Sequence, residues 1–299
     1  MIVYLVVSVL AFVPFIPILK ILPLDSSGGE LESSANLIFV FFLNISFIVA
    51  GWITTKWIEH RPPALLGMNF WPSSVKEFLV GVSIGVANFS VVLVILALLG
   101  EVSMRWSGIA ANDLDIFGFY FAVYLLFAMI EEVINRGYLF QTLCEGIGKA
   151  KAAVIISLIF SLIHIFNPEF SILAGVFLFV HGLLYAIAYL KTRSLWTPIG
   201  LHIAWNFAQG PIAGMQVSGT SVESSFFLTE AGGPDVLTGG SFGIEGGLVA
   251  IIISVIILLV ILKANWLKPS ERFLKVEREW AEGLQTQEQL SPPISGRTE

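Results

Sequence analysis

The chain has little charge, almost no cysteine and few basic residues. Only 13% of its 299 residues are charged, against about a quarter in a typical soluble domain. Cys144 is the single cysteine, which excludes a disulfide-stabilised scaffold. Lys and Arg together number 16, the net charge is −6, and no basic stripe is available to neutralise phosphates, so we expect no nucleic-acid partner. Hydrophobic residues make up 56% of the chain, which excludes a disordered protein and predicts a protein of the lipid bilayer.

Long apolar runs are abundant. A hydrocarbon core of about 30 Å takes roughly 20 apolar residues per helix. The runs are continuous rather than alternating, which favours helices over a membrane β-barrel. We therefore predict an all-α, polytopic membrane bundle of eight transmembrane helices, at about residues 2–23, 36–57, 78–99, 116–142, 152–166, 170–190, 195–213 and 246–264.

Basic residues fall in alternate loops. They gather in the second, fourth and sixth loops and in the tail, whereas the other loops are acidic and hold only Arg105. Because Lys and Arg accumulate on the cytoplasmic side, we expect both termini in the cytoplasm. We expect a membrane domain over residues 1–264 and a cytoplasmic tail over 265–299, with a charged helix near 269–290 and a disordered end. The membrane would be the plasma membrane in a prokaryote and the endoplasmic reticulum in a eukaryote.

Several ionisable or amide side chains fall inside the predicted spans, where charge is costly and usually functional. At about 1.5 Å per residue, Glu131 lies roughly 16 Å, His164 about 20 Å and His202 about 12 Å from the cytoplasmic end of its span. All three therefore lie near the midplane, on helices that can be neighbours. The candidates are Glu131, Glu132, Arg136, His164, His181, His202 and Asn206.

The spacing of these residues indicates chemical roles for them. Glu132 and Arg136 are four apart, with the acid first, which is the favourable order for a helix ion pair. Glu131 is turned by about 100° from Glu132, so it can face a polar cavity while its neighbour is paired. A carboxylate beside a histidine is a general-base arrangement. His202 and Asn206 share a helix face and offer donors to a developing oxyanion.

Three ordered motifs resemble those of the CAAX-protease and bacteriocin-processing intramembrane proteases, which include the type II CAAX prenyl endopeptidases and the Abi proteins. The motifs are Glu131-Glu132-x-x-x-Arg136, Phe160-x-x-x-His164 and His202-x-x-x-Asn206. The resemblance covers about residues 116–206, and it reaches 247 if a Gly-rich stretch is included. Each motif alone is weak, but three in order on separate membrane helices are specific.

The resemblance implies an intramembrane endopeptidase whose active site lies inside the bundle and is reached from the cytoplasm. Glu131 would activate water with help from His164. His202 and Asn206 would stabilise the oxyanion, and Arg136 would orient the acidic pair. The substrate would be a lipidated, prenylated C-terminal peptide, or a peptide that enters from the cytoplasmic leaflet. The six residues that the resemblance places in catalysis are Glu131, Glu132, Arg136, His164, His202 and Asn206.

Several alternatives stay open. The family has been described both as metalloproteases and as glutamate-type peptidases, so the cofactor is either a divalent metal such as zinc, bound by Glu131, His164 and His202, or none. A His-Glu-x-x-His helix is absent from the sequence. The chain could also be a catalytically silent scaffold or an immunity-type factor, and less readily a proton-coupled carrier, because no inverted repeat is visible. We expect His181 to be structural and Cys144 to be a packing residue.

Overall fold

The computed structural model describes residues 2–15, 30–108 and 114–290, and most of these residues are helical. Two short strands, β1 (Val102–Trp106) and β2 (Phe227–Ala231), are also present. The helices are α1 (Ile2–Phe12), α3 (Glu30–Ile53), α4 (Pro72–Leu98), α5 (Leu114–Arg136), α6 (Tyr138–Ile147), α7 (Lys149–Ile163), α8 (Ile172–Thr192), α9 (Trp196–Phe207), α10 (Asp235–Thr238), α11 (Leu248–Lys263) and α12 (Glu271–Leu290).

Four helical segments are long and apolar enough to cross a membrane, which supports the predicted class of an integral, helical membrane protein. α11 is apolar but has only 16 residues. α7 and α9 occupy the places of the fifth and seventh predicted spans and have 15 and 12 residues. The number of eight crossings therefore stays a prediction. The four segments are Phe41–Ile58, Pro72–Leu98, Leu114–Ile147 and Ile172–Thr192.

The predicted fourth span, 116–142, is interrupted. α5 ends at Arg136 and α6 begins at Tyr138, with Gly137 between them. A Cβ atom on Gly137 would lie 2.2 Å from the carbonyl oxygen of Val133, so the chain can turn this sharply only where no side chain is present. The interruption fixes the end of the helix that carries both adjacent glutamates.

A small antiparallel sheet was not predicted. β1 pairs with β2 in a register that places Val102 opposite Ala231 and Trp106 opposite Phe227. Both strands lie in segments that the sequence indicated only as loops, and more than a hundred residues separate them, so no hairpin signal connects them. The sheet ties the loop before α5 to the long segment between α9 and α11.

α4 and α9 pack with very little space between their backbones. A Cβ on Gly81 would lie 2.1 Å from the carbonyl oxygen of Thr197, and one on Gly200 would lie 2.2 Å from that of Phe78. Small residues at such contacts allow membrane helices to approach closely. Gly85 lies at the same contact, where a Cβ would be 2.5 Å from the carbonyl oxygen of Leu201.

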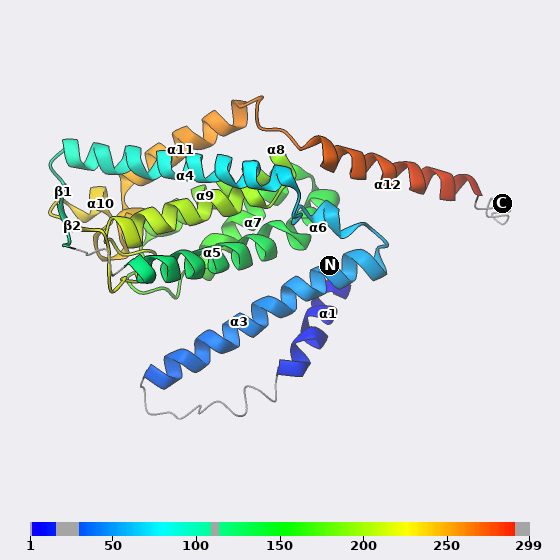
Figure 1. Ribbon diagram of the computed structural model, residues 1–299, viewed down its shortest axis with the longest axis horizontal. Coiled ribbons are helices and arrows are strands. Elements are labelled where there is room, and N and C mark those ends of the chain that lie inside the picture. Colours follow the sequence, from blue (N-terminus) through cyan, green and yellow to red (C-terminus); the bar gives the residue numbers. More distant parts are fainter. Residues whose placement is uncertain (1, 16–29, 109–113, 291–299) are drawn as a thin grey trace.

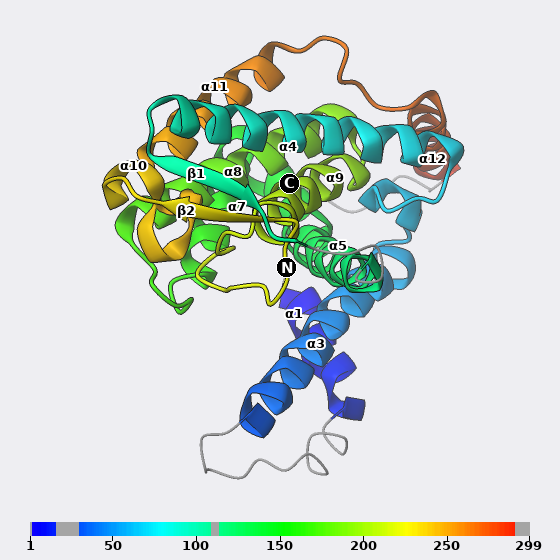
Figure 2. The same cartoon turned by 60° about the vertical axis from the view of Figure 1, so that its left-hand side comes forward.

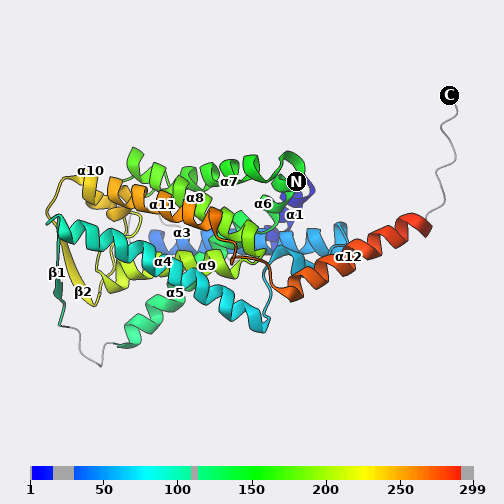
Figure 3. The ribbon, with the colours of Figure 1, turned by 90° about the horizontal axis from the view of Figure 1, so that it is seen from above.

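The two ends of the bundle are different. β1, β2 and α10 lie together at one end, and α6 and α12 lie at the other (Figures 1 and 3). We call these the sheet end and the tail end. α1 and α3 form a pair that extends away from the other helices (Figure 2).

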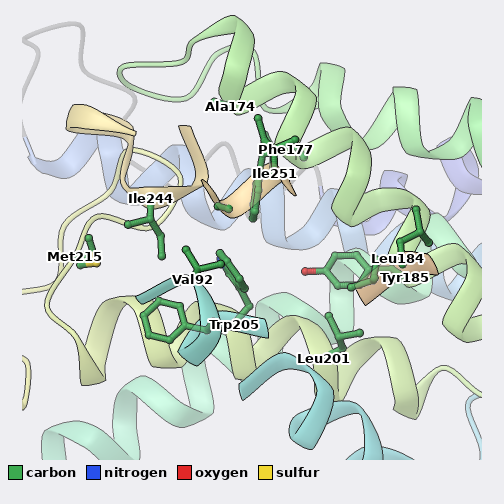
Figure 4. Packing of buried hydrophobic residues seen from close by; sticks show 14 of the residues in the cluster. Val92, Ala174, Phe177, Leu184, Tyr185, Leu201, Trp205, Met215, Ile244 and Ile251 are labelled. Carbon is green, nitrogen blue, oxygen red and sulfur yellow. The ribbon is translucent and has the colours of Figure 1, made fainter. Parts of the chain in front are cut away.

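The main core includes residues from the segment between α9 and α11 as well as from the helices. Trp205 of α9 belongs to one buried cluster with Phe177 of α8 and with Met215 and Ile244 of that segment (Figure 4). Burial of these large side chains fixes the segment to the bundle. Part of the segment is therefore integral to the fold at the sheet end.

The charged tail helix is present as predicted, as α12. The guanidinium carbon of Arg61 lies 5.2 Å from the ring centre of Trp280, and Arg193 lies 3.7 Å from Glu277. These contacts attach α12 to the loops of the tail end. The disordered end predicted after residue 290 lies outside the described residues.

Candidate active site

The two adjacent glutamates of α5 have different surroundings. The Glu132 side chain is fully buried, whereas that of Glu131 is 29% exposed and lines a cavity. The rotation of about 100° per residue places one carboxylate against the helix packing and the other in the cavity. The structure thus separates the pair as the spacing predicted.

Glu132 is held by Arg136. The Nη1 atom of Arg136 donates to Glu132 Oε1 at 3.0 Å, and its Nη2 atom donates to the carbonyl oxygen of Gly182 at 3.2 Å. The guanidinium lies over the rings of Phe160, at 4.7 Å, and Tyr185, at 5.2 Å. Because both charges are fully buried, each one depends on the other for compensation.

His202 continues this chain of contacts. Its Nδ1 lies 3.1 Å from Glu132 Oε1, and because a carboxylate accepts, Nδ1 carries the proton. The ring of Tyr185 stacks on the imidazole with centroids 4.9 Å apart and planes at 15°. Arg136, Glu132 and Tyr185 therefore fix the orientation of His202, and its Nε2 atom points toward Glu131.

His164 is oriented in a similar way from another helix. It directly follows Ile163, the last residue of α7, and so caps that helix instead of lying inside it. Its Nδ1 donates to the carbonyl oxygen of Phe160 at 2.7 Å, which leaves Nε2 as the atom that faces Glu131. The distances from Glu131 Oε2 to Nε2 of His164 and to Nε2 of His202 are both 4.0 Å.

Glu131, His164, His202 and Asn206 line one cavity of about 750 Å³. Asn206 follows His202 by one helical turn and makes no side-chain hydrogen bond within the described part of the chain. The structure therefore brings together the residues that the three motifs suggested, with Glu132 and Arg136 behind the cavity wall. The wall also includes aromatic residues, among them Phe119, Tyr120, Tyr124, Phe127, Phe160, Phe177, Tyr185 and Trp205.

His181 also borders the cavity, but its ring bonds to neighbouring helices. Its Nε2 lies 3.0 Å from Ser254 Oγ, and its Nδ1 lies 3.2 Å from the hydroxyl of Tyr185. Asn88 donates to Ser254 at 3.2 Å and completes a buried network that joins α4, α8 and α11. These contacts support a structural role.

Glu245 is a member of the site that the sequence did not identify. It is 2% exposed and borders the cavity. Its Oε2 accepts from the backbone nitrogen and the hydroxyl of Ser218, at 2.9 and 2.7 Å, and its Oε1 accepts from the indole of Trp205 at 3.2 Å. Burial raises the pKa of the Glu245 carboxyl to about 7.

The donors that could hold a metal are spaced too widely. Zinc ligands at about 2.0–2.2 Å in a tetrahedron lie roughly 3.3 Å from one another, whereas Glu131 is 4.0 Å from each histidine. Over the described residues, no group of three His, Cys, Asp or Glu side chains is arranged to hold a metal ion. The residues as placed do not fit zinc, and we derive no step through a metal.

Residues 113–208 match the family model described as "Type II CAAX prenyl endopeptidase Rce1-like". The matched segment begins one residue before α5 and ends just after α9, so it contains all six residues of the three motifs. The resemblance expected from those motifs is confirmed for this segment, and it indicates CAAX-type intramembrane protease activity. No curated protein and no solved structure matches the chain.

Proposed function

We propose that this protein is an intramembrane endopeptidase that hydrolyses a peptide bond with a water molecule activated by Glu131. The observation that carries the proposal is the approach of Glu131 Oε2 to the Nε2 atoms of His164 and His202, each 4.0 Å away, within one cavity. A separation of 4.0 Å leaves room for one water oxygen at about 2.8 Å from a carboxylate and an imidazole.

Glu131 acts as the general base. Its carboxylate takes one proton from the water, and the water oxygen forms a bond with the scissile carbonyl carbon as the carbonyl π electrons move onto the carbonyl oxygen. The second O–H bond of the water stays intact, and it donates a hydrogen bond to Nε2 of His164, which orients the water. When the intermediate collapses, the C–N bond breaks and the proton held by Glu131 passes to the leaving nitrogen.

His202 and Asn206 stabilise the oxyanion. The amide of Asn206 donates from one helical turn beyond His202. The imidazole can donate from Nε2 only when both ring nitrogens carry protons. Carboxylates on its two sides, Glu132 at 3.1 Å and Glu131 at 4.0 Å, stabilise that charged form. Arg136 acts through Glu132 as a positioning residue.

Around this site we propose an eight-span membrane domain over residues 1–264 and a tail over 265–299, with both termini in the cytoplasm. The basic loops of the tail end and the attachment of α12 to them support this orientation. The membrane is then the plasma membrane of a prokaryote or the endoplasmic reticulum of a eukaryote.

Cleavage of reporter peptides by the detergent-purified protein tests the activity. A farnesylated peptide and its unmodified form are compared, each with wild type and with His164→Ala, and each with and without a strong chelator. We expect cleavage by wild type, at least a hundredfold slower cleavage by the variant, and no effect of the chelator. Cleavage of only the farnesylated form assigns a prenylated substrate, and inhibition by the chelator would contradict the metal-free step.

A silent scaffold predicts a different pattern. If the chain acts by binding alone, folded wild type cleaves neither peptide, and a folded Glu131→Gln variant keeps its biological activity in cells. That pair of results would replace the peptidase by the scaffold.

A further inference from the structure

Charge is distributed unequally between the two ends of the bundle. Among the described residues, Arg105 is the one basic side chain of the sheet end, where Glu101, Glu223 and Glu230 also lie. The tail end contains the other described bases except the buried Arg136. They are Lys56, Arg61, Lys76, Lys149, Lys151, Lys191, Arg193, Lys263, Lys268, Arg272, Lys275 and Arg278. By the positive-inside rule, the tail end is cytoplasmic and the sheet end is not.

The catalytic cavity reaches water at the sheet end. Its rim includes the first turns of α5, Asn167 just beyond the end of α7, and the segment 217–223, in which Thr220 and Ser221 are exposed. Toward the tail end the cavity is closed by Arg136 and by the rings that flank it, all of which are buried. The route from solvent to Glu131 therefore starts between the loops of the sheet end.

This rim is held in place by several hydrogen bonds. Glu245 accepts from the backbone and the hydroxyl of Ser218, and Asn167 donates to the carbonyl oxygen of Ser218 at 3.2 Å. The hydroxyl of Tyr120 on α5 accepts from the backbone nitrogens of Glu223 and Ser224, at 3.2 and 3.3 Å. Three separate parts of the fold thus anchor the segment 217–224 around the opening.

The lining indicates the kind of peptide that enters. Apart from tyrosines, the ionisable side chains of the cavity wall are carboxylates and histidines, and over the described residues the wall has no Lys or Arg to bind a free C-terminal carboxylate. Phe119 and Phe127 of the wall are 64% and 44% exposed, so the wall offers accessible apolar surface. Such a wall suits an apolar stretch within a longer chain.

We propose that the catalytic cavity opens on the non-cytoplasmic face of the membrane and takes an internal, apolar segment of a peptide or membrane protein presented from that face. The identity of the substrate rests on the proposed peptidase activity, whereas the side of the opening does not. The resemblance implied access from the cytoplasm. If the tail end is cytoplasmic, a cavity that opens at the sheet end cannot be reached from the cytoplasm. The proposal therefore departs from that expectation.

Thiol labelling tests the side of the opening. In a Cys144→Ser background, which has no other cysteine, Ser221→Cys places a thiol at the rim and Lys151→Cys places one at the tail end; both positions are exposed. A membrane-impermeant maleimide is added to intact cells and to inverted membrane vesicles. We expect Ser221→Cys to label in intact cells and Lys151→Cys only in inverted vesicles.

The reverse pattern would overturn the proposal, and so would failure of Ser221→Cys to label in either preparation while it labels in denaturant. A second arm adds a membrane-impermeant reporter peptide with an internal apolar site to vesicles of each orientation. We expect cleavage by right-side-out vesicles and at least tenfold less by inverted ones. The expected labelling without cleavage on either side would support the orientation and reject the peptidase.

Discussion

Replacing Arg136 by Met is a direct test of the chain of contacts behind the cavity. The guanidinium is fully buried, donates to Glu132 at 3.0 Å and lies over two aromatic rings. Removal of one partner of a buried ion pair leaves an uncompensated charge and costs about 3–5 kcal/mol. We therefore expect Arg136→Met to lower the free energy of unfolding by about that amount, although Met fills much of the same volume.

Equilibrium unfolding in mixed detergent micelles measures this change, with Glu132→Gln and the double variant completing a cycle. Because the double variant has no unpaired charge, we expect it to be more stable than the sum of the single changes predicts, by at least about 1 kcal/mol. A free energy of unfolding of Arg136→Met within about 1 kcal/mol of the wild-type value would refute the view that the pair is electrostatically coupled. Strictly additive effects of the two substitutions on that free energy would refute it too.

Three further predictions concern other parts of the site. Asn206→Ala removes the proposed oxyanion donor, whose side chain makes no hydrogen bond within the described chain, so kcat on the reporter peptide should fall by about 10²–10³ with stability nearly unchanged. A loss of stability large enough to unfold the variant, or an unchanged kcat, would contradict this. Burial raises the pKa of Glu245 from 4.5 to about 7, so the folded state binds more protons between these values and stability should fall as the pH rises from about 4.5 through 7, by up to about 3 kcal/mol. Unfolding measured across that range should show a flatter pH dependence in Glu245→Gln, and an unchanged slope would reject the assignment. Gly137→Ala places a Cβ 2.2 Å from a carbonyl oxygen and should lower the melting temperature, whereas Gly283→Ala in α12, with open space around it, should not; equal effects would contradict the sharp turn.

Much of the candidate site could be predicted from the sequence because polar residues are conspicuous in apolar runs. Glu131 and Glu132 are adjacent, and helical rotation alone separates their surroundings. His164 and His202 occur in other apolar runs, so we expected these side chains to meet Glu131 inside one helical bundle. The structure adds the orientation of each ring, which depends on Phe160 and Glu132 and is not visible in spacing.

Other features depend on contacts between distant segments. Glu245 is one acid among several in a loop, and its burial results from Trp205 and Ser218, which are 40 and 27 residues away. The β1–β2 pairing has no local turn signal, and the interruption at Gly137 depends on the close approach of one carbonyl oxygen. Tertiary packing decides such features, and neither composition nor periodicity encodes them.

The central claim is that the Glu131 carboxylate activates the attacking water. The most direct measurement compares cleavage of one reporter peptide by purified wild type, Glu131→Gln and Glu282→Gln, the last being the same carboxyl-to-amide change on the exposed face of α12. With all three equally stable, we expect Glu131→Gln to cleave at least about 100-fold more slowly than wild type, and Glu282→Gln to match wild type. Cleavage by folded Glu131→Gln at the wild-type rate would contradict the account.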